Sequence, residues 1–209
     1  MSDGMALAFV YTDEPMTNLF TGAYRETNDI GIITKVKDNR TLVEIDGVPA
    51  TKKYAQWAGV DADSLAGGNL LVHTITSPIG VKDRLGDLVA IRHHMNGNED
   101  YSMAIGANLA EKTAIIRMEA TVDELIGSAT DTLEELKKKV KGPVAAYHLV
   151  HCGGRRAGIG DRMNEVVEAL CKAAGDVPFI MVFTFGEYGF EDDGNNTTGG
   201  LMLSYTAIK

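Results

Sequence analysis

The chain of 209 residues contains only two cysteines, Cys152 and Cys171, and five prolines. Two cysteines are too few for the disulfide framework of a small secreted domain, and no Cys/His cluster has the spacing of a zinc site. No apolar run approaches the roughly 20 residues that cross a membrane, and the first four residues lack a basic signal-peptide region. We therefore predict a reduced, cytoplasmic protein without a metal, in which Cys171 is a buried helical thiol.

An excess of basic residues is also missing. The chain has 29 acidic and 20 basic residues, which gives a net charge of −9. A nucleic-acid surface needs a basic stripe, and the one lysine cluster, at residues 137–139, is better explained as the end of a helix. We expect neither a nucleic acid nor a membrane as a partner.

What the chain has is a series of short apolar runs separated by turns. These runs predict strands over residues 5–11, 30–36, 41–45, 70–75, 88–93, 101–105 and 113–118. Pro49 and Gly59 bound a short helix. The polar turn at residues 96–98 and the other short links favour antiparallel pairing.

The second half of the chain adds two long helices. Thr121 and Glu124 form a capping box that starts a helix over residues 121–141. A second helix is predicted over residues 159–174, and the remaining strands over residues 144–151, 178–185 and 200–207. The fold class is therefore mixed α/β, with an antiparallel-rich sheet and two long helices in a layered arrangement.

The segment His151-Cys152-Gly153-Gly154-Arg155-Arg156 lies at a strand-to-helix turn. Ligands of open α/β sheets usually bind beside the carboxyl ends of strands. Glycines let the backbone approach a ligand, and arginines present forked donors that match carboxylates or phosphates. The alternative is an ordinary connection with solvated arginines.

The same segment resembles a known family. Cys152-x-Gly154-Arg155-Arg156, followed by Phe183-Thr184-Phe185-Gly186-Glu187, is similar to the C-terminal half of a FIST (F-box and intracellular signal transduction) domain. The segments at residues 54–59 and 91–98 resemble the short helix and central hairpin of that family. One departure is that residues 194–198 lack a histidine that the family pattern often has.

The resemblance implies a domain organisation and a site. Residues 1–47 would end an N-terminal FIST half, and residues 48–209 would form the FIST C-terminal domain. The predicted ligand-binding residues, which should converge at one edge of the sheet, are Cys152, Gly154, Arg155, Arg156, Thr184, Glu187 and Asn196. Strands 144–151 and 178–185 flank a helix, so a right-handed crossover would make them parallel.

Residues 2–12 resemble residues 198–206, since both have a polar entry with glycine, an apolar strand and then Tyr-Thr. If the parent domain is a duplication, the chain starts at the last strand of the first copy. Residues 1–47 carry too few apolar residues for a core of their own. We expect residues 5–11 and 30–45 to join the main sheet or a neighbouring molecule.

Two alternative chemistries depend on other residues. Cys152 could be the nucleophile of a hydrolase or transferase, although His148 and His151 are poorly placed on a strand to activate it. His93 or His94, with His73 on another predicted strand, could bind haem, which would make the protein a gas sensor.

The family resemblance implies a non-enzymatic sensory module, in which Glu187 shares a pocket with Arg155 and Arg156. A pocket with Arg155 or Arg156 at one pole and Glu187 at the other suits a zwitterion such as an amino acid. The alternative for these residues is an internal ion pair that closes the turn. Binding would shift a conformational equilibrium and signal to a protein partner or another domain, with homo-oligomerisation as a further option.

Overall fold

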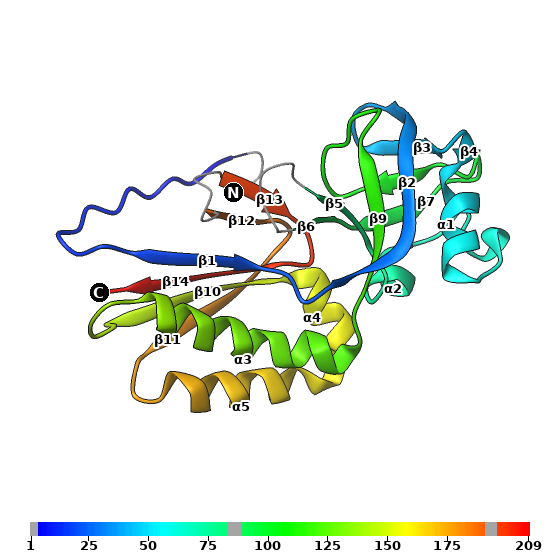
Figure 1. Ribbon diagram of the computed structural model, residues 1–209. Helices are drawn as coiled ribbons and strands as arrows, with labels where there is room; N and C mark the ends of the chain where they lie inside the picture. The colour runs from blue at the N-terminus through cyan, green and yellow to red at the C-terminus, as the bar shows by residue number, and fades with distance from the viewer. Residues whose placement is uncertain (1–3, 83–88, 191–195) are drawn as a thin grey trace.

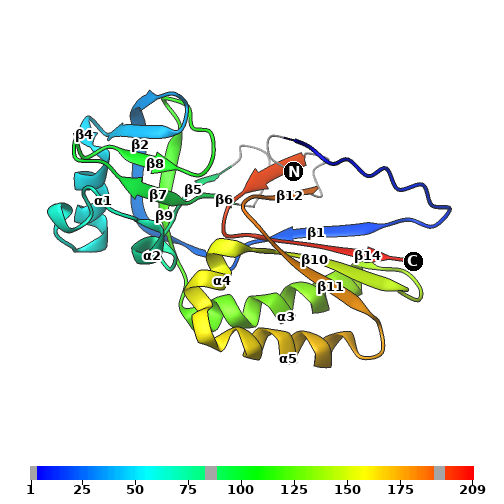
Figure 2. The ribbon, with the colours of Figure 1, turned by 180° about the vertical axis from the view of Figure 1, so that it is seen from behind.

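The computed structural model describes residues 4–82, 89–190 and 196–209, and it has two lobes (Figure 1). The first lobe is built on a four-stranded sheet, in the order β1 (Thr17–Thr21), β14 (Leu203–Ile208), β10 (Ala146–Cys152) and β11 (Phe179–Thr184). The helices of this lobe are α3 (Val122–Lys139), α4 (Gly153–Ile159) and α5 (Met163–Ala174). Helices α3 and α5 cover one face of the sheet (Figure 2). Strands β10 and β11 are parallel, as predicted, so their carboxyl ends lie at the same edge.

Helix α3 begins at the predicted capping box. The Thr121 hydroxyl accepts the backbone N–H of Glu124 at 3.1 Å, and the Glu124 carboxylate accepts the backbone N–H of Thr121 at 2.6 Å. These bonds satisfy two N–H groups that the first turn leaves free. The completely buried side chains of the helix recur at helical spacing, namely Leu125, Ala129, Leu133 and Leu136. This stripe packs against the sheet and forms the main core of the first lobe.

The second lobe is an antiparallel sheet in the order β6-β5-β9-β2-β3-β8-β7, with β4 paired to β3. Its strands are β2 (Arg25–Lys37), β3 (Thr41–Ile45), β4 (Val48–Pro49), β5 (Ile79–Lys82), β6 (Val89–Arg92), β7 (His94–Gly97), β8 (Met103–Ile105) and β9 (Ala114–Glu119). Helices α1 (Ala50–Ala58) and α2 (Leu71–Thr74) complete the lobe. The predicted β2–β3 hairpin and the end of α1 at a left-handed Gly59 are confirmed.

The hairpin of β12 (Glu187–Phe190) and β13 (Asn196–Gly199) lies beside β1. Gly189 packs so closely on Phe20 that a Cβ atom added there would lie 2.1 Å from the Phe20 Cβ. Phe20, Ile91, Met118 and Leu201 belong to one buried cluster that contains residues of both lobes. The lobes therefore share a core at their junction.

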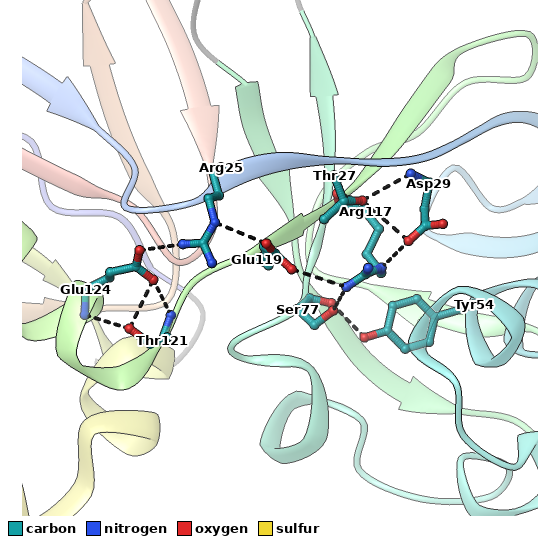
Figure 3. A network of polar contacts seen from close by, with 9 residues as sticks. All are labelled: Arg25, Thr27, Asp29, Tyr54, Ser77, Arg117, Glu119, Thr121 and Glu124. Atoms are coloured by element: carbon teal, nitrogen blue, oxygen red, sulfur yellow. Dashed lines mark hydrogen bonds and ion pairs between the residues drawn. The ribbon is translucent and has the colours of Figure 1, made fainter.

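A chain of ion pairs also runs across this junction (Figure 3). Arg25 pairs with Glu124 at the start of α3 and with Glu119 in β9, the latter at 3.1 Å. Arg117 in turn lies 4.0 Å from Glu119 and 2.7 Å from Asp29 in β2. The chain of charges connects the start of α3 in the first lobe to the sheet of the second.

The mixed fold with an antiparallel-rich sheet is confirmed, but three local predictions of secondary structure are wrong. Residues 70–75 contain helix α2 rather than a strand, because Asn69 Oδ1 accepts the Leu71 N–H at 3.0 Å and starts a turn. Leu70 and Thr74, four residues apart, are thereby buried on one side. Asn96 and Gly97 belong to strand β7 rather than to a turn. For residues 70–75, a short apolar run does not by itself distinguish a strand from a short helix.

The third error concerns the N-terminus. Residues 4–16 form neither a helix nor a strand, although residues 5–11 were expected to be a strand. Residues 17–47 are divided between the lobes, because β1 pairs with β14 while β2 and β3 pair in the second lobe.

Cys171 is exposed, contrary to the prediction, and both cysteines are free thiols. Helix α5 buries Val166, Leu170 and Ala174. Cys171 follows Leu170 by one residue, about 100° around the helix, and so faces away from the core. No helix among residues 4–82, 89–190 and 196–209 combines the length and the apolar character that a membrane span requires.

Candidate functional site

A buried polar cluster lies at the carboxyl ends of β10 and β11. Cys152 and Thr184 are neighbours in the parallel register. The Thr184 hydroxyl donates to Glu187 Oε1 at 2.8 Å, and the Met202 backbone N–H donates to Glu187 Oε2 at 3.2 Å. Burial raises the pKa of Glu187, which is completely enclosed, and the hydrogen bonds from Thr184 and Met202 oppose that rise. Both Glu187 oxygens are therefore already bonded by the chain itself.

Cys152 accepts hydrogen bonds on its sulfur. The backbone N–H groups of Gly154 and Leu201 both lie 3.3 Å from Sγ. Burial and the nearby Glu187 carboxylate raise the pKa of Cys152 to about 11. Burial and then Arg155 lower the pKa of His151 to about 4, and its Nδ1 lies 3.0 Å from the Cys152 carbonyl oxygen. At neutral pH the sulfur is a protonated thiol, which is a poor nucleophile.

Arg155 is completely buried, because α4 starts directly after Cys152 and turns this side chain inward. Its Nη2 donates to the Leu125 carbonyl oxygen at 2.7 Å and also to the Ser128 hydroxyl. Its Nε and Nη1 have no hydrogen-bond partner, and no salt bridge of Arg155 occurs among the described residues. Burial lowers the pKa of this guanidinium, as expected for a cation away from water.

Two tyrosines near Arg155 were not predicted from the sequence. Burial raises the pKa of Tyr24 and of Tyr205, and the positive charge of Arg155 opposes both rises. The Tyr24 hydroxyl donates to the Ile75 carbonyl oxygen at 2.8 Å, whereas the buried Tyr205 hydroxyl has no hydrogen-bond partner among residues 4–82, 89–190 and 196–209. Tyr24 precedes β2 and Tyr205 lies in β14, so no local motif links them to the Cys152 segment.

The structure brings only part of the predicted set together. Cys152, Gly154, Thr184 and Glu187 form the cluster, and Arg155 lies beside it. Arg156 is exposed, and its guanidinium carbon lies 4.9 Å from the centre of the Phe183 ring. Asn196 is exposed and pairs with Phe190 at one end of the β12–β13 hairpin, whereas Glu187 pairs with Gly199 at the other. Arg156 and Asn196 therefore lie outside the cluster.

A groove with a volume of about 360 Å³ lies between the β1–β2 connection and α3. It is lined by Thr21, Gly22, Ala23, Glu124, Gly127, Ser128, Asp131, Thr132 and Glu135. Ser128 forms part of this wall and also bonds Arg155, so the buried guanidinium lies directly behind the groove. The carboxylates of Glu124, Asp131 and Glu135 give the groove an acidic wall.

The histidines do not form a ligand set. His73 lies on helix α2 and is exposed, so it forms no cross-strand pair with His94. His94 is completely buried, with its ring 4.6 Å from that of Tyr54, and burial lowers its pKa to about 3. His93 packs against Gly106 and Gly200, where an added Cβ would lie 2.1 Å and 1.9 Å from its ring. This enclosure does not favour haem ligation, and the described residues contain no group of three or more potential metal ligands.

One comparison with known proteins gives a match. The model of the FIST C domain family matches residues 50–189, which is more than half of the chain. This region contains Cys152, Arg155, Thr184 and Glu187, the predicted residues that lie in or beside the buried cluster. Neither the curated proteins nor the solved structures include a significant match.

Proposed function

Because this chain belongs to the FIST C domain family, a family of sensory signal-transduction domains, we propose that it binds a small ligand inside the cell without chemical conversion. Binding shifts a conformational equilibrium, and the shift is passed to a protein partner or to another domain. The raised pKa of Cys152 argues against the alternative, a thiol-dependent hydrolase or transferase.

The observation that carries the proposal is the unpaired guanidinium of Arg155. Buried charges in proteins are normally paired, since the effective desolvation penalty is several kcal/mol per ion. Within the part of the chain that the structure describes, two of the three nitrogens of Arg155 have no hydrogen-bond partner, and the nearby Tyr205 hydroxyl also has none. A ligand carboxylate that accepted hydrogen bonds from Arg155 and from the Tyr205 hydroxyl would satisfy both groups, and its charge would pair with the guanidinium.

The groove gives a ligand access to Arg155 and provides negatively charged groups for the other end of the ligand. A ligand that enters it meets Ser128 first, with Arg155 behind the Ser128 hydroxyl. Asp131 and Glu135 in the groove wall suit an ammonium group better than Glu187, whose two oxygens are already occupied. A positive pole inside and a negative rim outside fit an amino acid. Access to Arg155 requires the Ser128 side chain to rotate away.

Thermal-shift measurements with a panel of amino acids, dicarboxylic acids, phosphates and haem test the proposal. A ligand that binds the native state raises the melting temperature by mass action. We expect an amino acid to raise it for the wild type and for Arg156→Lys, but not for Arg155→Lys, because lysine lacks the fork. Arg156→Lys is the matched control, since it changes the next residue in the same way at the surface.

If an amino acid still raises the melting temperature of Arg155→Lys, the proposed site is wrong. Circular dichroism of each variant separates lost binding from lost folding. A Soret band after incubation with haem would instead favour the gas-sensor alternative.

A further inference from the structure

Residues 4–11 form an apolar segment that is almost fully exposed. Its large side chains keep most of their surface in water, with exposures of 80% for Met5, 73% for Leu7, 79% for Phe9, 65% for Val10 and 92% for Tyr11. No backbone hydrogen bond joins residues 4–11 to another part of the chain that the structure describes. Soluble proteins rarely expose so continuous an apolar stretch unless it contacts a partner.

The segment has the residue pattern of a central strand. It runs from Gly4 through an apolar stretch to Tyr11-Thr12, as the chain does from Gly200 to Tyr205-Thr206. The latter stretch includes the first four residues of β14, which lies between β1 and β10 and is largely buried. A run that is apolar at successive positions is typical of a strand with both faces covered. Residues 5–11 therefore have the residue pattern of a strand, but within this chain they pair with no described strand.

The first lobe has an open strand edge at β11. Among the described strands, β11 pairs only with β10, so one row of its backbone groups has no strand partner. This edge carries exposed apolar side chains, since Ile180 is 59% exposed and Phe183 is 38% exposed. Natural edge strands are usually protected by charged residues or proline. Strand β11 has the sequence FIMVFT and contains neither.

The opposite edge of the same sheet fits the segment less well. Strand β1 presents Thr17, Asn18 and Thr21, and the Asn18 amide is already bonded to Ser204 and Thr206. In its own chain the segment leads into β1, so residues 12–16 would have to cross the sheet to bring it to β11. A second molecule presents its β11 edge without this restriction.

We propose that residues 5–11 add as a fifth strand to the β11 edge of a second copy of this chain, and that the exchange is reciprocal. Both halves of the contact are present in one chain, so a two-fold axis closes the pair and leaves neither segment exposed. Each chain carries a net charge of −9, but residues 5–12 and β11 contain no charged residue. Repulsion between the copies is therefore weakest where the strands meet.

Analytical ultracentrifugation of the full chain, with the variants Phe9→Asp and Ile180→Asp, tests the proposal. We expect a dimer for the wild type, and each substitution should weaken the dimer by about tenfold or more, because the new charge then packs against apolar side chains of the neighbouring strand. Both positions are exposed in the single chain, so folding is preserved. Val72→Asp is the matched control, since Val72 is 70% exposed on α2, in the other lobe, and should leave the dimer intact.

Hydrogen exchange then identifies the strand. The amides of residues 5–11 should be protected in the wild-type dimer and should exchange freely in Ile180→Asp. A monomeric wild type overturns the proposal, and so does a dimer that survives both substitutions. Protection of residues 5–11 that persists in Ile180→Asp would show that the segment pairs elsewhere. None of these results depends on the ligand at Arg155.

Discussion

At the scale of single residues, the candidate site contains two different kinds of buried polar group. Glu187 and Cys152 are bonded by Thr184 and by backbone N–H groups, and they tie the strand ends together. Arg155 is completely buried, and two of its nitrogens have no hydrogen-bond partner among the residues that the structure describes. The first arrangement stabilises the fold, whereas the second is the basis of the ligand site that we propose.

This difference leads to a prediction for stability. Arg155→Met, measured by urea unfolding without ligand, should raise the free energy of unfolding by about 1–3 kcal/mol, because methionine fills much of the space without burying a charge. Arg156→Met should change it by less than about 0.5 kcal/mol, as most surface substitutions do. A loss of stability in Arg155→Met would mean that the guanidinium is already compensated in the native protein.

At the scale of elements, α3 connects the groove to the core. One side carries the buried stripe of Leu125, Leu133 and Leu136, and another lines the groove through Gly127 and Ser128. Glycine inside a helix destabilises it by about 1 kcal/mol relative to alanine. Gly127 is therefore an unfavourable residue at this position, and a Cβ atom added there would meet nothing within 4 Å.

Gly127→Ala should accordingly raise the free energy of unfolding by about 0.5–1 kcal/mol. The same methyl group narrows the groove, so the ligand that stabilises the wild type should bind Gly127→Ala more weakly. Denaturant titrations with and without that ligand separate the two effects. Unchanged binding would mean that the ligand does not use this groove.

At the scale of the whole molecule, the lobes are joined by a shared apolar cluster and by the ion pairs of Figure 3. The two arginines in this chain of charges differ in burial. The side chain of Arg25 is 53% exposed, whereas that of Arg117 is 18% exposed and also donates to the Ser77 hydroxyl at 3.1 Å. Water and salt therefore screen the pairs of Arg25 much more than those of Arg117.

We predict that Arg117→Met lowers the free energy of unfolding by about 1.5–3 kcal/mol, because it leaves the partly buried Asp29 without its partner. Arg25→Met should lower it by less than about 1 kcal/mol, and raised salt should reduce that effect further. Equal effects of the two variants would contradict this ranking of the contacts. Equilibrium unfolding at low and high salt provides the measurement.

Local signals in the sequence determined many of the elements. The capping box at Thr121 and Glu124, the glycine that ends α1, and the apolar periodicity of α3 each act through nearby residues, so they can be recognised without the fold. The family resemblance and the parallel pairing of β10 with β11 were also accessible, because ordered motifs and chain handedness restrict them.

Only the tertiary structure decided which of these residues meet. The sequence could not distinguish Arg155 from Arg156, yet the turn into α4 buries the first and exposes the second. The sequence did not reveal that Tyr205 and Ser128 lie near Arg155. It also did not reveal that residues 5–11 have no neighbouring strand among the described residues of this chain. Propensity and capping depend on contacts within a few residues, whereas burial, pKa and strand pairing depend on groups that only the complete fold brings together.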